Sequence, residues 1–197
     1  MNSKIPADLY TLEMANNHMG DLEHGLHVIR TFGEICKKYP FSFAFKLQYR
    51  ELDSFIHPDM KGRDDVPYIK RFSETRLTRG DLDTLVKEIR NQGFLTMATP
   101  FDEKSVDIIE SQDLDFIKIP SCSFGDWPLL DRICQSDKPI IASTAGATIK
   151  TIDQVVSYLT HRKKDFAILH CVGEYPTPDE NMHISQIDYL KDRYPDV

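Results

Sequence analysis

The chain has little positive charge and no long apolar run. Its 197 residues carry 24 Lys and Arg against 31 Asp and Glu, which gives a formal net charge of -7. A nucleic-acid surface needs clustered cations, so this balance argues against one, whereas a small anionic ligand needs only a few local cations. No stretch approaches the roughly 18 apolar residues of a membrane span, and residues 1–10 lack the apolar core of a secretory signal. We expect a cytoplasmic protein with no nucleic-acid or membrane partner.

Cysteine is also scarce, and the four cysteines are far apart. Cys36, Cys122, Cys134 and Cys171 form no CxxC pair, so neither a zinc knuckle nor a disulfide framework is indicated. Free thiols are the expectation. Sequence repeats and low-complexity segments are absent, and the length suits one domain with a substantial core.

Short apolar segments alternate with longer segments of helical periodicity. Strands are expected over 9–15, 43–48, 94–100, 115–121, 139–144 and 166–171. Helices are expected over 21–39, 79–92, 102–112, 126–136, 149–162 and 183–194. This alternation predicts a mostly parallel sheet, either an open doubly wound sheet or a closed barrel. Residues 49–77 are the one long irregular stretch, and such stretches are usually functional or mobile.

Two helices carry more specific signals. In the expected helix over 21–39, one apolar stripe contains Leu22, Leu26, Ile29 and Phe32, and Thr78 is placed to cap the expected helix over 79–92.

About six strand–helix units are visible, whereas a closed barrel needs eight and about 250 residues. The sequence ends just after a helix, so we expect either an open sheet or an incomplete barrel.

Polar residues gather where the expected strands end. These residues are Glu13, Lys46, Gln48, Thr99, Lys118, Ser121, Ser143, Thr144, His170 and, just beyond, Tyr175. The carboxyl ends of parallel strands share one edge of a sheet or barrel, where ligands bind. We therefore expect the site there.

Two lysines in this set follow apolar runs. Lys46 follows Phe-Ala-Phe and Lys118 follows Phe-Ile, so each needs an anionic partner or a lowered pKa. A bound phosphate or carboxylate would supply that partner, and the hydroxyls of Thr99, Ser121 and Ser143 would add hydrogen bonds. The residues thus predict a small, strongly anionic ligand.

Several of these residues, and two of the cysteines, also have a purely structural interpretation. A strand-end lysine can lie in a rim salt bridge, and Glu13 can pair with a neighbour. His170 has apolar neighbours, which favours a satisfied core histidine. Tyr175 can simply pack its loop. Cys122 and Cys171 fit small buried apolar side chains better than nucleophiles.

Seven short motifs follow one another in a fixed order. They are E-x-x-x-N-H-x-G over 13–20, K-x-Q over 46–48, T-P-F over 99–101, K-I-x-S over 118–121, W-P-L-L over 127–130, K-P-I-I-x-S-T over 138–144 and H-C-x-x-x-Y-P-T-P over 170–178. Each is weak alone, but together they make the chain resemble the sialic acid synthase family, from residue 13 to residue 195.

The resemblance implies a TIM-type (β/α) barrel, with about six of its eight βα units in residues 1–197. It implies condensation of phosphoenolpyruvate with an N-acetylmannosamine-like sugar aldehyde to a sialic acid-type nonulosonate, with release of phosphate. It gives catalytic roles to three residues: Lys46, Lys118 and Glu13. It gives substrate-binding roles to five: Gln48, Thr99, Ser121, Ser143 and Tyr175, the last nearer the sugar.

The resemblance also implies a divalent metal, Mn or Mg, that would polarise the aldehyde. The family's metal histidines would lie on strands after Val197, as would a small antifreeze-like domain. We therefore expect no metal site in this chain and no catalytic turnover by this chain alone. Among partners, the resemblance allows for a homodimer. The chain departs from many relatives at Ser123 (an acidic position) and at Gly173 (an Asn position), and from some relatives at Met19 (an acidic position).

Two other functions fit the same residues. One is a barrel aldolase with Lys118 as a Schiff-base amine, which needs a lysine with a lowered pKa. The other is a non-catalytic remnant that binds a sugar or an anion.

Overall fold

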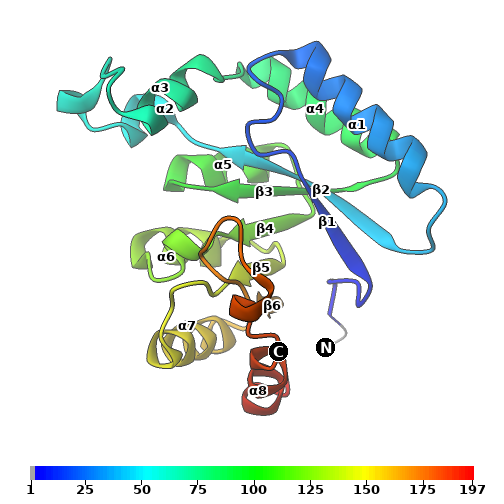
Figure 1. Cartoon of the computed structure of the whole chain (residues 1–197), viewed down its shortest axis with the longest axis vertical. Coiled ribbons are helices and arrows are strands. Elements are labelled where there is room, and N and C mark those ends of the chain that lie inside the picture. The colour runs from blue at the N-terminus through cyan, green and yellow to red at the C-terminus, as the bar shows by residue number, and fades with distance from the viewer. Residues whose placement is uncertain (1–2) are drawn as a thin grey trace. The chain divides into compact units, whose positions relative to one another are not determined.

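The computed structural model describes residues 3–197, which form two compact units. The N-terminal unit is Pro6–Asp115, and the C-terminal unit is Phe116–Val197 together with residues 3–5. Strands and helices alternate along both units (Figure 1). Within residues 3–197, no helix has the length and apolar content that crossing a membrane requires.

The N-terminal unit contains three strands and five α-helices. In order they are β1 (Leu9–Glu13), α1 (Leu22–Cys36), β2 (Ser42–Tyr49), α2 (Leu52–Phe55), the 3-10 turn η1 (Pro58–Met60), α3 (Pro67–Glu74), α4 (Arg79–Asn91), β3 (Leu95–Pro100) and α5 (Glu103–Ser111). β2 pairs in parallel with β1 on one side and with β3 on the other. The register places Glu13 beside Lys46, and Gln48 beside Thr99.

The C-terminal unit repeats this plan. Its elements are β4 (Phe116–Ile119), the 3-10 turn η2 (Ser121–Ser123), α6 (Trp127–Gln135), β5 (Ile140–Ser143), α7 (Ile149–His161), β6 (Phe166–Leu169), the 3-10 turn η3 (Asp179–Asn181) and α8 (Gln186–Arg193). β5 pairs in parallel with both β4 and β6. The expected α/β fold with parallel strands is therefore confirmed within each unit. All six strands lie within two residues of their expected bounds.

Helix α1 packs on α4 through glycines, which the periodicity did not anticipate. Its buried face includes Gly25 and Gly33, while Phe32 is 39% exposed. A Cβ at Gly33 would lie 2.3 Å from the Oε1 atom of Gln92. Phe32, on the expected stripe, is partly exposed, but its ring packs edge-on against the buried Phe45 of β2 with 6.2 Å between centroids.

The stretch 49–77 was expected to be irregular, and this was wrong in part. It contains α2, η1 and α3, and α3 begins with Pro67, whose fixed φ suits a first helical position. The predicted cap at Thr78 is confirmed: its side chain accepts from the backbone N–H of Asp81, and Asp81 accepts from the backbone N–H of Thr78. This capping box fixes where the segment ends and α4 begins.

Candidate functional site

Lys46 lies at the end of β2 with carboxylate and hydroxyl partners from the flanking strands. It is buried, its Nζ atom donates to Oε2 of Glu13 on β1, and it lies 3.4 Å from Oγ1 of Thr99 on β3. The other carboxylate oxygen of Glu13 accepts from the backbone N–H of Ala15 at 2.8 Å. The anionic partner that Lys46 requires is thus present in the chain, as the structural interpretation of Glu13 anticipated.

Lys118 lies at the end of β4 among hydroxyls of its own unit. It is buried, and its Nζ atom donates to Oγ of Ser143 and, at 2.9 Å, to the carbonyl oxygen of Ile119. Oγ of Ser143 also lies 3.2 Å from the Cys171 thiol, which donates to it. Oγ of Ser121 accepts from the backbone N–H of Ala145 at 3.1 Å. We call Lys118, Ser121, Ser143 and Cys171 the Lys118 group.

The Lys118 group suits the binding of an anion. A buried ammonium exerts a stronger field than an exposed one, and serine hydroxyls can donate to phosphate or carboxylate oxygens. The helices and strands of the unit hold these side chains before a ligand arrives, which is how preorganised electrostatic stabilisation works.

Several expected residues lie elsewhere. Tyr175 is 96% exposed, so the interpretation that it packs its loop is wrong. His170 is only half buried and contacts the Met182 carbonyl oxygen through Nε2 at 2.8 Å, so it is not a core histidine. Cys122 is exposed and Cys171 is half buried, so neither is the buried apolar side chain that was expected. The expected free thiols are confirmed for all four cysteines.

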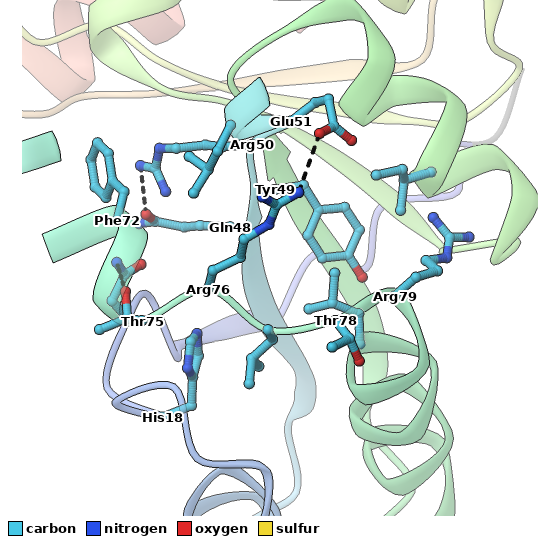
Figure 2. A pocket seen from close by; sticks show the side chains of 15 residues that line it. His18, Gln48, Tyr49, Arg50, Glu51, Phe72, Thr75, Arg76, Thr78 and Arg79 are labelled. Atoms are coloured by element: carbon cyan, nitrogen blue, oxygen red, sulfur yellow. Dashed lines mark hydrogen bonds and ion pairs between the residues drawn. The ribbon is translucent and has the colours of Figure 1, made fainter. Parts of the chain in front are cut away.

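The segment between β2 and α4 encloses a cavity of about 430 Å³ in the N-terminal unit (Figure 2). Gln48 lies at its edge, and its Oε1 atom accepts from Nη2 of Arg50 at 2.9 Å. The Arg50 guanidinium lies between two aromatic rings, 4.1 Å from the Phe72 centroid and 3.7 Å from that of Phe101. The sequence predicted Gln48 from its place at a strand end. It did not predict the Arg50 contact or the two rings around Arg50, because Phe72 and Phe101 are distant in sequence.

His18 lines the same cavity and is buried. Its Nδ1 atom accepts from the backbone N–H of Gly20 at 3.1 Å. Burial, with a smaller contribution from His24, lowers the pKa of His18 from its usual value. The ring is therefore neutral near pH 7, and its proton is on Nε2.

Two further arginines at the cavity are matched by carboxylates. Arg76 lies 3.0 Å from Asp53 and 3.6 Å from Glu51, and its hydrogen bond to Asp53 lowers the pKa of that carboxyl. Arg79 lies 3.3 Å from Asp83. The cavity therefore carries little uncompensated positive charge on these two side chains.

The described residues do not fit the divalent metal that the resemblance implies. Over residues 3–197, no three His, Cys, Asp or Glu side chains lie close enough together to hold a metal ion.

Parallel strands, each followed by a helix, and buried lysines at strand ends define an α/β protein suited to small anionic ligands. Residues 43–197 match the NeuB family, and the chain belongs to that family. The resemblance to sialic acid synthases is thereby confirmed.

Similar proteins support this assignment. A solved Chromobacterium violaceum structure, described as spore coat polysaccharide biosynthesis protein E, is 56% identical with a TM-score of 0.94, over 96% of this chain and 56% of that one. The N-acetylneuraminic acid synthetase of Leptospira borgpetersenii, solved with citrate, is 25% identical with a TM-score of 0.82, over 96% and 62% of the two chains. The N,N'-diacetyllegionaminic acid synthase of Campylobacter jejuni is 33% identical over 50% of this chain and 30% of that protein.

The chain spans about half the length of the curated relatives that match most of it. The activity of the whole protein therefore belongs to the proposal that follows.

Proposed function

We propose that this chain belongs to an enzyme that condenses phosphoenolpyruvate with an N-acylated amino sugar aldehyde and releases phosphate. Membership of the NeuB family over residues 43–197 carries the proposal. Its named relatives include synthases of N-acetylneuraminic and N,N'-diacetyllegionaminic acid. A TIM-type barrel for the whole enzyme, and an N-acetylmannosamine-like substrate, are parts of the same proposal.

The proposed reaction balances without an oxidant or a reductant. The enol carbon C3 of phosphoenolpyruvate forms a bond to the aldehyde carbon, and the aldehyde oxygen takes up a proton. Water adds at C2 and loses a proton, which gives a tetrahedral intermediate that still carries phosphate. This intermediate expels phosphate and becomes the ketone of the nonulosonate.

In each unit, a buried lysine would serve as the binding group for an anion such as the phosphate or carboxylate of phosphoenolpyruvate. Lys118 and the hydroxyls of Ser121 and Ser143 are preorganised donors for phosphate or carboxylate oxygens. In the N-terminal unit, Lys46 would be the cation, with Thr99 beside it. Glu13, which accepts from Lys46, would hold that ammonium in place.

Two further expectations belong to the proposal. A divalent metal, Mn²⁺ or Mg²⁺, would supply Lewis-acid activation of the aldehyde when bound. Tyr175 would approach the sugar from its exposed loop. We expect the 197-residue chain alone to bind phosphoenolpyruvate weakly and not to turn over.

The Schiff-base alternative receives less support from the site. Such a lysine must attack the substrate carbonyl through its Nζ atom, whereas the Lys118 Nζ atom contacts both Ser143 and the Ile119 carbonyl. These contacts would have to be given up before the attack.

A calorimetric titration of the chain with phosphoenolpyruvate tests the proposal. Lys118→Ala should weaken binding at least tenfold, because a charge-assisted contact of about 1.5–3 kcal/mol is lost. Lys150→Ala, at an exposed position of α7, is the matched control and should change nothing. Circular dichroism establishes that both variants are folded. Equal affinities of the two variants, or no binding by the folded chain, would count against the proposal.

A further inference from the structure

A second cavity of the N-terminal unit lies at the amino-terminal ends of β2 and β3, away from the carboxyl ends where Lys46 and Thr99 lie. Its volume of about 410 Å³ falls within the roughly 300–1,000 Å³ that is usual for small-molecule sites. Its walls come from the starts of these strands and from the last turns of α1 and α4, which lie side by side (Figure 1). We call it the amino-end cavity. Its lining residues, all from the described part of the chain, include none of the predicted catalytic or substrate-binding residues.

Aromatic rings form much of the wall of the amino-end cavity. The rings that line it are those of Tyr39, Phe41, Phe43 and Phe94. The Phe41 and Phe43 rings meet at 75° with 6.3 Å between centroids, and the Phe43 and Phe94 rings meet at 78° with 6.5 Å between centroids. A further flat ring can lie face-on to one such ring and edge-on to the next, which is the geometry that aromatic pairs prefer. These walls therefore suit a planar aromatic group.

The ring of Phe41 is held in place and still accessible. It contacts the ring of Tyr10 on β1 with 4.7 Å between centroids. Phe41 nevertheless remains 43% exposed, and Tyr39 remains 55% exposed. Exposed apolar side chains that gather at a concave surface are typical of ligand-binding grooves. A ligand ring would thus bury aromatic surface that the fold leaves in water.

The charge at the amino-end cavity favours an anionic group on the ligand. Its lining includes one charged side chain, that of Lys37, and no carboxylate. Lys37 follows the last turn of α1 and is exposed, and within residues 3–197 its ammonium forms no ion pair. A carboxylate at the rim could therefore pair with this ammonium without displacing another acid.

The inner wall determines which end of such a ligand enters. Gln92 donates through Nε2 to Oε1 of Glu88 at 3.0 Å, which leaves its own Oε1 atom as an acceptor. That oxygen lies against α1, because a Cβ built on Gly33 would be 2.3 Å from it. An acceptor at the inner wall repels a carboxylate, so the ring enters and the carboxylate stays at the rim.

We propose that the amino-end cavity binds a small aromatic monocarboxylate, with its ring against Phe41 and Phe43 and its carboxylate at Lys37. The ligand is a free small molecule, because the cavity has room for one ring and its lining supplies one cation. This inference is independent of the proposed function, since it uses a different part of the N-terminal unit.

Three probes that share one ring and differ in charge test the proposal. They are 3-phenylpropanoate, 3-phenylpropan-1-ol and 3-phenylpropylammonium, each titrated calorimetrically into the 197-residue chain at low ionic strength, where exposed ion pairs are least screened. Wild type should bind the acid about fivefold more tightly than the alcohol, as one exposed ion pair allows, and the ammonium most weakly. Binding of the ammonium as tight as that of the acid, or no binding of the acid by the folded chain, would overturn the inference.

Paired variants locate the bound probe. Phe41→Ala should weaken binding of the acid about fivefold, because one ring contact is lost. Phe55→Ala is its matched control, since Phe55 is 41% exposed on α2 and lies outside the cavity. Lys37→Gln should make the acid bind no better than the alcohol, whereas Lys38→Gln, at the next exposed position and outside the lining, should keep the preference. Circular dichroism establishes that each variant is folded, and equal behaviour within either pair would overturn the inference.

A last variant separates this site from the strand-end lysines. Lys118→Ala should bind 3-phenylpropanoate as wild type does, because Lys118 belongs to the C-terminal unit and does not line the amino-end cavity. Loss of 3-phenylpropanoate binding in this variant would place the probe in the Lys118 group and would overturn the inference. The phosphoenolpyruvate titrations of the proposed function can fail or succeed without changing either result.

Discussion

Glu13 and Lys46 are direct neighbours in the register of β1 and β2, and their side chains form an ion pair at the carboxyl ends of these strands. The lysine is buried and the carboxylate is partly exposed. The pair shows how a parallel sheet can hold a cation at its edge before any ligand binds.

The Glu13–Lys46 pair leads to a prediction about ligand-dependent stability. Glu13→Gln leaves the buried ammonium with a weaker partner, so the free energy of unfolding should fall by about 1–2 kcal/mol, less than for a fully buried pair. Inorganic phosphate should then raise the melting temperature of the variant more than that of wild type, because phosphate replaces the lost anion. Differential scanning fluorimetry over a phosphate series measures both effects. Equal phosphate shifts would mean that no anion reaches Lys46.

Ser143 is the acceptor shared by Lys118 and Cys171, and its removal should weaken the C-terminal unit. Ser143→Ala leaves both donors without their Oγ partner and should lower the free energy of unfolding by about 1–3 kcal/mol. Urea denaturation measures the change. Ser157→Ala, at an exposed position on α7, should have an effect within about 0.5 kcal/mol. A similar loss in both variants would show that the hydroxyl of Ser143 adds nothing specific.

His18 should make stability depend on pH near neutrality. Its folded-state pKa is below its usual value of 6.5, so below about pH 6.5 the unfolded chain binds a proton that the folded chain does not. Stability should therefore fall as the pH drops from 7 toward 5, and rise again on return. His18→Asn keeps an acceptor for Gly20 but cannot titrate. Urea midpoints of wild type minus those of the variant isolate this contribution, and a difference that does not change with pH would contradict it.

Gly20 and Gly62 separate two costs of adding a side chain. Both have positive φ, +76° and +75°, but a Cβ at Gly20 would lie 2.8 Å from the Glu74 carbonyl oxygen, whereas Gly62 has nothing within 4 Å. Gly62→Ala should cost about 1 kcal/mol from backbone strain alone. Gly20→Ala should cost at least about 1 kcal/mol more, because backbone atoms of α3 and the following residue must move. Thermal melts compare the two, and equal losses would show that α3 yields freely.

The strands were predictable because each is a short apolar run, and parallel strands buried on both faces need such runs. Lys46 and Lys118 were predictable for the same reason, because each follows an apolar run that forms a strand. The α1–α4 contact could not be inferred, because periodicity counts apolar side chains and gives no weight to Gly25 and Gly33. The helices within 49–77 were missed because they are only four and eight residues long, too short for a helical period to stand out in the sequence.

The site was predictable only where it depends on strand position. Lys46 and Lys118 are fixed by register, so residue type and place sufficed. The exposure of Tyr175 depends on a loop conformation that no periodicity describes. The Arg50 contacts join residues 50, 72 and 101, which only the folded chain brings together.

The placement of Arg50 bears on how the shape of the cavity at Gln48 could change. Phe72 belongs to α3, in the segment between β2 and α4, whereas Gln48 belongs to the sheet. The contacts of Arg50 with Phe72 and Gln48, rather than strand pairing, connect this wall of the cavity to the sheet. Replacement of that segment could therefore reshape the cavity while the strands and their lysines kept their register. The shape of the cavity can thus change at the edge of the fold while the strand-end lysines stay in place.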